Sequence, residues 1–176
     1  MKKSSIQKAL YCFDMVEVES GEILTLCGSF RGRQSRGRLA FYPNTKGERR
    51  INGRRYEKAS YETGYVIHNL RKVLDLPGEQ HFIIDRSQII RLYRCTKAFV
   101  GLPKQQRAQC RRLIDLLHNH CGINPTMHGL TGSGALHSVE PASDYDWIIY
   151  TRDPRSVQEF VTSRPEFGRE LTFSMQ

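Results

Sequence analysis

The sequence predicts an α+β fold in which a β-rich, basic N-terminal module precedes a small α/β core. Three patterns support this prediction. Short alternating runs dominate the first third of the chain, a long amphipathic helical pattern follows Pro103, and an apolar run rich in aromatic and β-branched residues spans 147–150. The first and third patterns are typical of strands, and the second is typical of a helix that packs on one face.

The composition is that of a folded, basic protein. Of 176 residues, 39% are hydrophobic and 10% are aromatic, and the formal net charge is +9. No apolar stretch approaches membrane-spanning length, and the N-terminus lacks the apolar segment of a signal peptide. The five cysteines are scattered without a C-x-x-C pair, which indicates reduced thiols. We therefore predict a cytoplasmic protein with no membrane partner, and the sequence leaves its oligomeric state open.

Most strand signals lie within residues 12–58. Val16 and Val18 alternate with acidic residues, and Asn52-Gly53 is a strong signal for a two-residue hairpin turn. The other signals here are a turn at Ser20-Gly21, a strand over 23–30, and a strand over 39–42 that ends at Pro43-Asn44.

The charge is concentrated in the same region. Residues 31–55 contain nine basic residues and one acid, Glu48, which sums to +8, whereas residues 139–176 sum to −3. The nine are Arg31, Arg33, Arg36, Arg38, Lys46, Arg49, Arg50, Arg54 and Arg55. Such an excess on hairpins with interspersed aromatic residues suits a phosphate backbone. We predict RNA or DNA binding at Arg49, Arg50, Arg54 and Arg55. The alternative is a solvated basic surface with no polymer partner.

The middle of the chain is predicted to alternate helix and strand. Apolar residues at 66, 70 and 73 have helical spacing, which predicts a helix over 61–74 that ends before Pro77-Gly78. A short buried strand follows over 80–84. Asp85 and Ser87 are suited to cap a brief helical turn that runs through Ile90.

The clearest helix is predicted to begin at Pro103 and to end before Gly122, which suits the position after a helix terminus. Its apolar face consists of Cys110, Leu113, Ile114, Leu117 and Cys121. His118 and His120 near its end lie about 200° apart around a helix, so they do not face one metal ion. A further helix is predicted over 153–162.

Gly132-Ser133 is the first part of a candidate site. A strand predicted over 127–131 runs into Gly132, and one helical turn is predicted over 133–137. A glycine lets a ligand approach the backbone, and the free N–H groups at the start of a helical turn favour anions. His128 and His137 flank this turn and are further candidates to meet a phosphate.

Asp144 and Asp146 are the second part of the site, at the start of the predicted strand over 147–150. Side chains two apart on a strand point to the same face, so these two carboxylates project side by side. Adjacent carboxylates repel unless a cation lies between them, and Mg²⁺ takes oxygen ligands from carboxylates and phosphates. The pattern predicts a phosphoryl-transfer site that uses Mg²⁺ or Mn²⁺. The alternative is a capping serine and a solvated turn that carries two acids.

This pattern resembles the nucleotidyltransferases of the DNA polymerase β superfamily. The resemblance rests on the Gly-Ser pair, on an Asp-x-Asp that begins 11 positions after Ser133, and on the apolar strand that follows. The order of elements also resembles an uncharacterised, mostly archaeal group of predicted nucleotidyltransferases, which Phe13-Asp14, Gly53 and Tyr56 match loosely.

The resemblance implies an NTP held at Gly132 and Ser133 and catalytic metal ions held at Asp144 and Asp146. The superfamily carries a third carboxylate on a later strand. In this chain Glu170, before an apolar run, is the candidate for it. The alternatives are a shortened core and a degenerate site that lacks the third carboxylate.

We therefore expect three segments: a β-rich basic module over 1–60, a connecting α/β segment over 61–102, and a nucleotidyltransferase-like core over 103–176. The expected function is Mg²⁺-dependent transfer of a nucleotidyl group from an NTP to an acceptor that the sequence does not identify. The alternative is a non-catalytic nucleic-acid-binding protein that keeps the fold, and a metal-dependent phosphoesterase is a third hypothesis.

Overall fold

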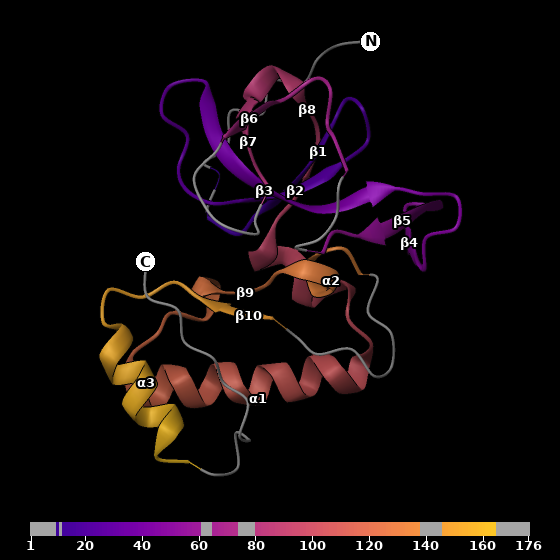
Figure 1. Cartoon of the computed structure of the whole chain (residues 1–176). Helices are drawn as coiled ribbons and strands as arrows, with labels where there is room; N and C mark the ends of the chain where they lie inside the picture. The colour runs from indigo at the N-terminus through magenta and orange to yellow at the C-terminus, as the bar shows by residue number, and fades with distance from the viewer. Residues whose placement is uncertain (1–9, 11, 61–64, 74–79, 138–145, 165–176) are drawn as a thin grey trace.

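Among the described residues, eight antiparallel strands form one curled sheet. The computed structural model describes residues 10, 12–60, 65–73, 80–137 and 146–164. The strands are β1 (Met15–Val18), β2 (Ile23–Leu26), β3 (Gln34–Pro43), β4 (Arg49–Ile51), β5 (Arg54–Lys58), β6 (Arg71–Val73), β7 (His81–Asp85) and β8 (Ile89–Tyr93). Their order is β4-β5-β3-β2-β1-β8, and β7 pairs with both β3 and β6. Figure 1 shows the sheet curling round on itself.

Alternation along the strands builds the interior of this curl. In β3, exposed Arg36 and Arg38 alternate with buried residues, and one of these buried residues, Leu39, belongs to the interior cluster. This is the pattern of a strand with one face in a core and one in solvent. The interior cluster consists of Leu10, Val16, Val18, Leu24, Leu26, Leu39, Ile67, Leu70, Phe82, Ile84 and Ile89.

A second layer packs below the sheet. Its elements are η2 (Cys95–Gly101), α1 (Lys104–Cys121), η3 (Pro125–Met127), β9 (His128–Leu130), α2 (Gly132–Ala135), β10 (Trp147–Ile149) and α3 (Pro154–Thr162). Figure 1 shows α1 running beneath β9 and β10, with the curled sheet on their other side. Leu130 of β9 packs with Cys110 of α1, and Leu117 of α1 packs with Val157 of α3.

The α+β fold class is confirmed, and so are the elements with strong local signals. The helix after Pro103 ends where Gly122 adopts the left-handed conformation, with φ of 67°. The Asn52-Gly53 turn has φ of 50° and 81°, which joins β4 to β5 as a tight hairpin. The Asp153 side chain caps α3 by accepting from the Ser156 N–H at 3.1 Å.

The helix predicted over 61–74 is wrong for the residues that the structure describes. Residues 65–73 contain no helix, and Arg71–Val73 forms β6, with Arg71 opposite Ile83 of β7. Leu70 is buried while Val66 is 62% exposed, so the helical spacing of the two does not mark one buried face. Pairing with the edge of β7 overrides the local pattern.

Three predicted boundaries also shift. The turn that Asp85 caps is η1 (Arg86–Gln88), and it ends before Ile90 because Ile89 begins β8. The strand predicted over 39–42 begins at Gln34, because the exposed arginines in the first half of β3 carry no apolar strand signal. The strand predicted over 23–30 ends at Leu26.

The strands of the predicted connecting segment join those of the N-terminal module in one sheet. Within the described part of the chain, none of the helices has the length and apolarity needed to cross a bilayer.

Candidate functional site

The candidate site is a turn between two strands that lie side by side. β9 leads into Gly132, and β10 pairs antiparallel with β9 so that Trp147 lies opposite Leu130. The ladder extends one step further, because the Thr131 N–H donates to the Asp146 carbonyl oxygen at 2.9 Å. This register brings Asp146 to the glycine turn.

Gly132 leaves the space that the Asp146 side chain occupies. The φ of Gly132 is 58°, in the left-handed region that favours glycine. A Cβ at this position would lie 2.6 Å from Asp146 Oδ2, which is closer than real contacts allow. The carboxylate therefore packs directly against the glycine backbone, and any side chain at this position has to displace it.

The Asp146 carboxylate is exposed to solvent. Within the described residues, no hydrogen bond or ion pair engages its oxygens. Ser133 is half-buried beside it, while Ala135 and Leu136 are buried and anchor the turn. Because α2 has four residues, a helix macrodipole contributes little here. The turn therefore presents one exposed carboxylate, which lies against the half-buried Gly132.

The other two predicted carboxylates, Asp144 and Glu170, lie outside the described residues. Among the residues that are described, no group of three or more His, Cys, Asp or Glu side chains is placed to hold a metal ion. Asp146 does supply an exposed carboxylate oxygen at the turn, which is the type of ligand that Mg²⁺ accepts.

His128 is not placed to meet a phosphate. It is 1% exposed, and its Nδ1 accepts a hydrogen bond from Trp147 Nε1 at 3.2 Å. Burial lowers the pKa of His128 to about 4, so the ring is neutral near pH 7. Its Nε2 has no hydrogen-bond partner among the described residues. His137 is exposed, and its ring lies over the backbone of Gly101, where a Cβ would be 2.2 Å from His137 Cε1.

The curled sheet supports the turn through polar contacts that the sequence did not indicate. Thr131 Oγ1 donates to the Phe13 carbonyl oxygen at 3.2 Å. The buried Asp14 carboxylate accepts from the Cys95 N–H at 3.0 Å. The paired residues are 118 and 81 positions apart in the chain, so no local pattern could have revealed them.

The same polar cluster extends from Cys95 to Tyr150. Cys95 Sγ lies 2.9 Å from the Tyr150 hydroxyl, which donates to the Cys12 carbonyl oxygen at 2.5 Å. Burial raises the pKa of Cys95 to about 12 and also raises the pKa of Tyr150. Both groups therefore stay protonated at neutral pH, and the cluster holds the two layers together rather than supplying a nucleophile.

The basic hairpin β4–β5 lies beside the same turn. Ile51 and Tyr56 of the hairpin are buried in one hydrophobic cluster with Ala135 and Leu136. The hairpin and the Gly132 turn, which the sequence assigns to separate segments, therefore share a core.

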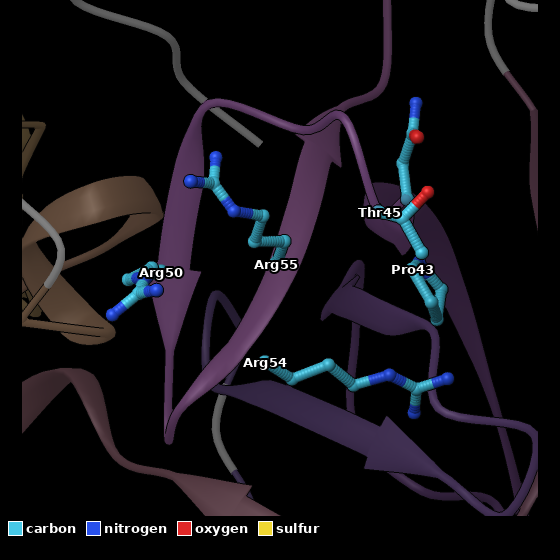
Figure 2. A pocket seen from close by; sticks show the side chains of 6 residues that line it. Pro43, Thr45, Arg50, Arg54 and Arg55 are labelled. Carbon is cyan, nitrogen blue, oxygen red and sulfur yellow. The ribbon is translucent and has the colours of Figure 1, made fainter.

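Eight of the nine basic residues of 31–55 are exposed, and Arg49 is half-buried. Figure 2 shows Arg50, Arg54 and Arg55 around a pocket on the hairpin. The pocket has a volume of about 500 Å³ and is lined by Pro43, Asn44, Thr45, Arg50, Arg54 and Arg55.

No family model, no curated protein and no solved structure matches this chain.

Proposed function

We propose that this chain is a nucleotidyltransferase that moves a nucleotidyl group from an NTP to an acceptor. The observation that carries the proposal is the exposed Asp146 carboxylate packed against the backbone of Gly132. It places an acidic oxygen directly on the glycine turn. Because Asp146 and the turn both belong to a two-strand ladder, their mutual position is held by backbone hydrogen bonds.

In this reaction an acceptor hydroxyl oxygen forms a bond to the α-phosphorus of the NTP. The bond from the α-phosphorus to the oxygen that bridges to the β-phosphate breaks, pyrophosphate leaves, and the hydroxyl proton passes to solvent. The protein contributes mainly by holding the reactants in line and by balancing their charge. We assign the contact with the triphosphate to Gly132 and Ser133.

The exposed carboxylate fits Mg²⁺, for which Mn²⁺ is a substitute, because both prefer oxygen ligands. In the proposal Asp146 and Asp144 hold the metal, with Glu170 as the third ligand. When bound, the metal neutralises charge on the phosphate oxygens.

Calorimetry with Mg²⁺ and a non-hydrolysable NTP tests this assignment. Asp146→Asn should weaken binding of the Mg·NTP complex at least about tenfold, because it removes the charge while keeping the shape. Gly132→Ala should have a similar effect, since its Cβ collides with the carboxylate. Asp115→Asn on α1 is the matched control, because Asp115 is also exposed and lies on another element. If Asp146→Asn binds as the parent does, the site is misassigned.

The exposed arginines favour a second candidate, a nucleic-acid-binding protein that keeps this fold without catalysis. Incubation with labelled NTPs and candidate acceptors (RNA, DNA, protein) in Mg²⁺ or Mn²⁺ separates the two. Transfer of label that Asp146→Asn abolishes supports the enzyme. Tight binding of RNA or DNA without any transfer supports the binder.

A further inference from the structure

Hairpin β4–β5 holds two guanidinium groups in a costly arrangement. Arg50 lies directly opposite Arg55 in the antiparallel ladder, and both side chains are exposed. Like charges at directly opposed positions of two strands destabilise the pair. Within the described residues, no ion pair compensates either charge.

The two side chains are also partly oriented. Arg55 Nη1 donates to the Gly47 carbonyl oxygen at 3.1 Å, which anchors this guanidinium beside the loop before β4. Arg54 is placed differently: it lies 5.9 Å over the Tyr56 ring, and its Nη1 is against Gly21 of the β1–β2 turn. In Figure 2 Arg54 extends away from Arg50, out to the side of the hairpin on which Pro43 lies. Arg50 and Arg55 are therefore the pair that is available to an anion.

The pocket that these residues line is chemically suited to a phosphate. Its lining contains three guanidinium groups, the Thr45 hydroxyl and the Asn44 amide, and it contains no carboxylate. Guanidinium groups bind phosphate oxygens through paired N–H donors, which makes arginine the usual partner of phosphate in nucleic-acid recognition.

The pocket and the candidate active site share the hairpin but use opposite faces of it. Ile51 and Tyr56 pack with Ala135 and Leu136, which follow the Gly132 turn, and alternation along the strands turns Arg50 and Arg55 to the other face. An acceptor strand bound to these two arginines would have to pass round the edge strand β4 to reach the turn. We infer that the acceptor is a nucleic acid whose backbone phosphate binds between Arg50 and Arg55. Its role as the acceptor rests on the proposed nucleotidyl transfer, whereas its binding to the two arginines does not.

A polymer is favoured over a single phosphate because the basic surface continues beyond the pocket. On β3, Arg36 and Arg38 are exposed on one face, and Arg36 and Arg71 of β6 lie on either side of Ile83 in the ladder. A chain of repeated phosphates can contact several of these cations at once and release their counterions.

The test is anisotropy of fluorescently labelled single-stranded RNA and DNA oligonucleotides, titrated with the full chain at several salt concentrations. Arg50→Gln combined with Arg55→Gln should weaken binding at least about tenfold. It should also reduce the slope of log K against log salt by about 1.4, which is 0.7 for each lost contact to a single strand. Arg50→Lys combined with Arg55→Lys keeps both charges and should retain most of the salt slope.

The charge-matched control is Arg111→Gln combined with Arg112→Gln, on the exposed face of α1. It removes the same charge from another element and should leave affinity within about twofold. Equal losses in the two glutamine variants would overturn the inference, because net charge and not the pocket would then explain binding. Binding to anionic phospholipid vesicles but not to the oligonucleotides would also overturn it.

Failure of this inference is distinguishable from failure of the proposed function. Asp146→Asn should bind the oligonucleotides as the parent does but lose the Mg·NTP complex. The Arg50 and Arg55 variant should bind Mg·NTP within about twofold of the parent but lose the oligonucleotide. In the transfer assay, label should appear on the oligonucleotide with the parent and the α1 control only.

Discussion

The two layers of the molecule use their acidic residues in opposite ways. The curled sheet buries Asp14, Glu17 and Glu22, which are 0%, 9% and 4% exposed. The lower layer exposes Asp146 at the Gly132 turn, where no described residue pairs with its carboxylate.

Each buried acid in the sheet is matched by hydrogen-bond donors. Asp14 accepts from the Cys95 N–H, and Glu22 accepts from the Tyr65 hydroxyl at 2.8 Å and from Ser20. Burying a carboxylate is costly unless such donors surround it. These acids therefore serve the fold, whereas Asp146, which no described residue pairs, is available to a ligand.

Glu17 shows the same principle in a larger network. The Tyr93 hydroxyl donates to Glu17 Oε2 at 2.8 Å and accepts from Asn52 Nδ2 at 2.6 Å, and Arg91 Nη1 lies 3.7 Å from Glu17 Oε2. Because Asn52 is the turn of hairpin β4–β5, this network ties the basic hairpin to β1 and β8.

The largest difference in stability is expected when a buried acid and the exposed acid are each replaced by alanine. Asp14→Ala leaves the buried Cys95 N–H without an acceptor, so the free energy of unfolding should fall by about 3 kcal/mol. Asp146→Ala should change it by less than about 0.5 kcal/mol. Urea unfolding followed by circular dichroism measures both. Similar losses for the two variants would show that the division between structural and available acids is wrong.

A second effect concerns the buried His128 of the lower layer. Burial lowers its pKa from 6.5 to about 4, so the unfolded chain takes up this proton at a higher pH than the folded chain. The contribution of neutral, buried His128 to the free energy of unfolding is fully present above about pH 6.5. It is lost as pH falls toward 4, and the loss amounts to about 2 to 3 kcal/mol.

The measurement for His128 is the free energy of unfolding of the parent and of His128→Gln between pH 7 and pH 4. The variant removes the titrating group and keeps an acceptor for Trp147 Nε1. As pH falls, the free energy of unfolding should decrease more for the parent than for the variant. A difference that stays constant over this range would contradict the buried, neutral histidine.

The smallest effect is expected for Tyr93→Phe, which removes one donor from Glu17. The free energy of unfolding should fall by about 1 to 2 kcal/mol, because the carboxylate and Asn52 each lose a partner. Tyr42→Phe is the control, since Tyr42 stacks on Tyr65 with ring centroids 4.2 Å apart and its hydroxyl has no hydrogen bond among the described residues. An equal cost for both substitutions would indicate that the loss of a tyrosine hydroxyl in general, and not of the bond to Glu17, lowers the free energy of unfolding.

Much of the candidate site could be anticipated from the chain alone. A glycine before a helical turn and an acid before an apolar run are local features, and the strand–turn–strand arrangement they predict is present. What the pattern could not provide is the contact itself, because Asp146 reaches Gly132 only through the register of β9 and β10. Asp144 and Glu170 stay predictions.

The sequence by itself determined the elements whose signals are contained in a few consecutive residues. Pro103 and Gly122 bound α1, and Asn52-Gly53 requires the left-handed backbone of a tight hairpin. Backbone sterics act on single residues and their neighbours, so these elements need no tertiary contact to be specified.

Tertiary structure alone decided the rest. Pairing with the edge of β7 made β6 a strand, packing in the lower layer buried His128 beside Trp147, and a shared hydrophobic cluster placed the basic hairpin beside Ala135 and Leu136. Tertiary structure also joined Asp14 to Cys95 across 81 positions. Such partners are selected by burial and by hydrogen-bond pairing when the sheet closes on the second layer, and these energies depend on the whole fold rather than on local spacing.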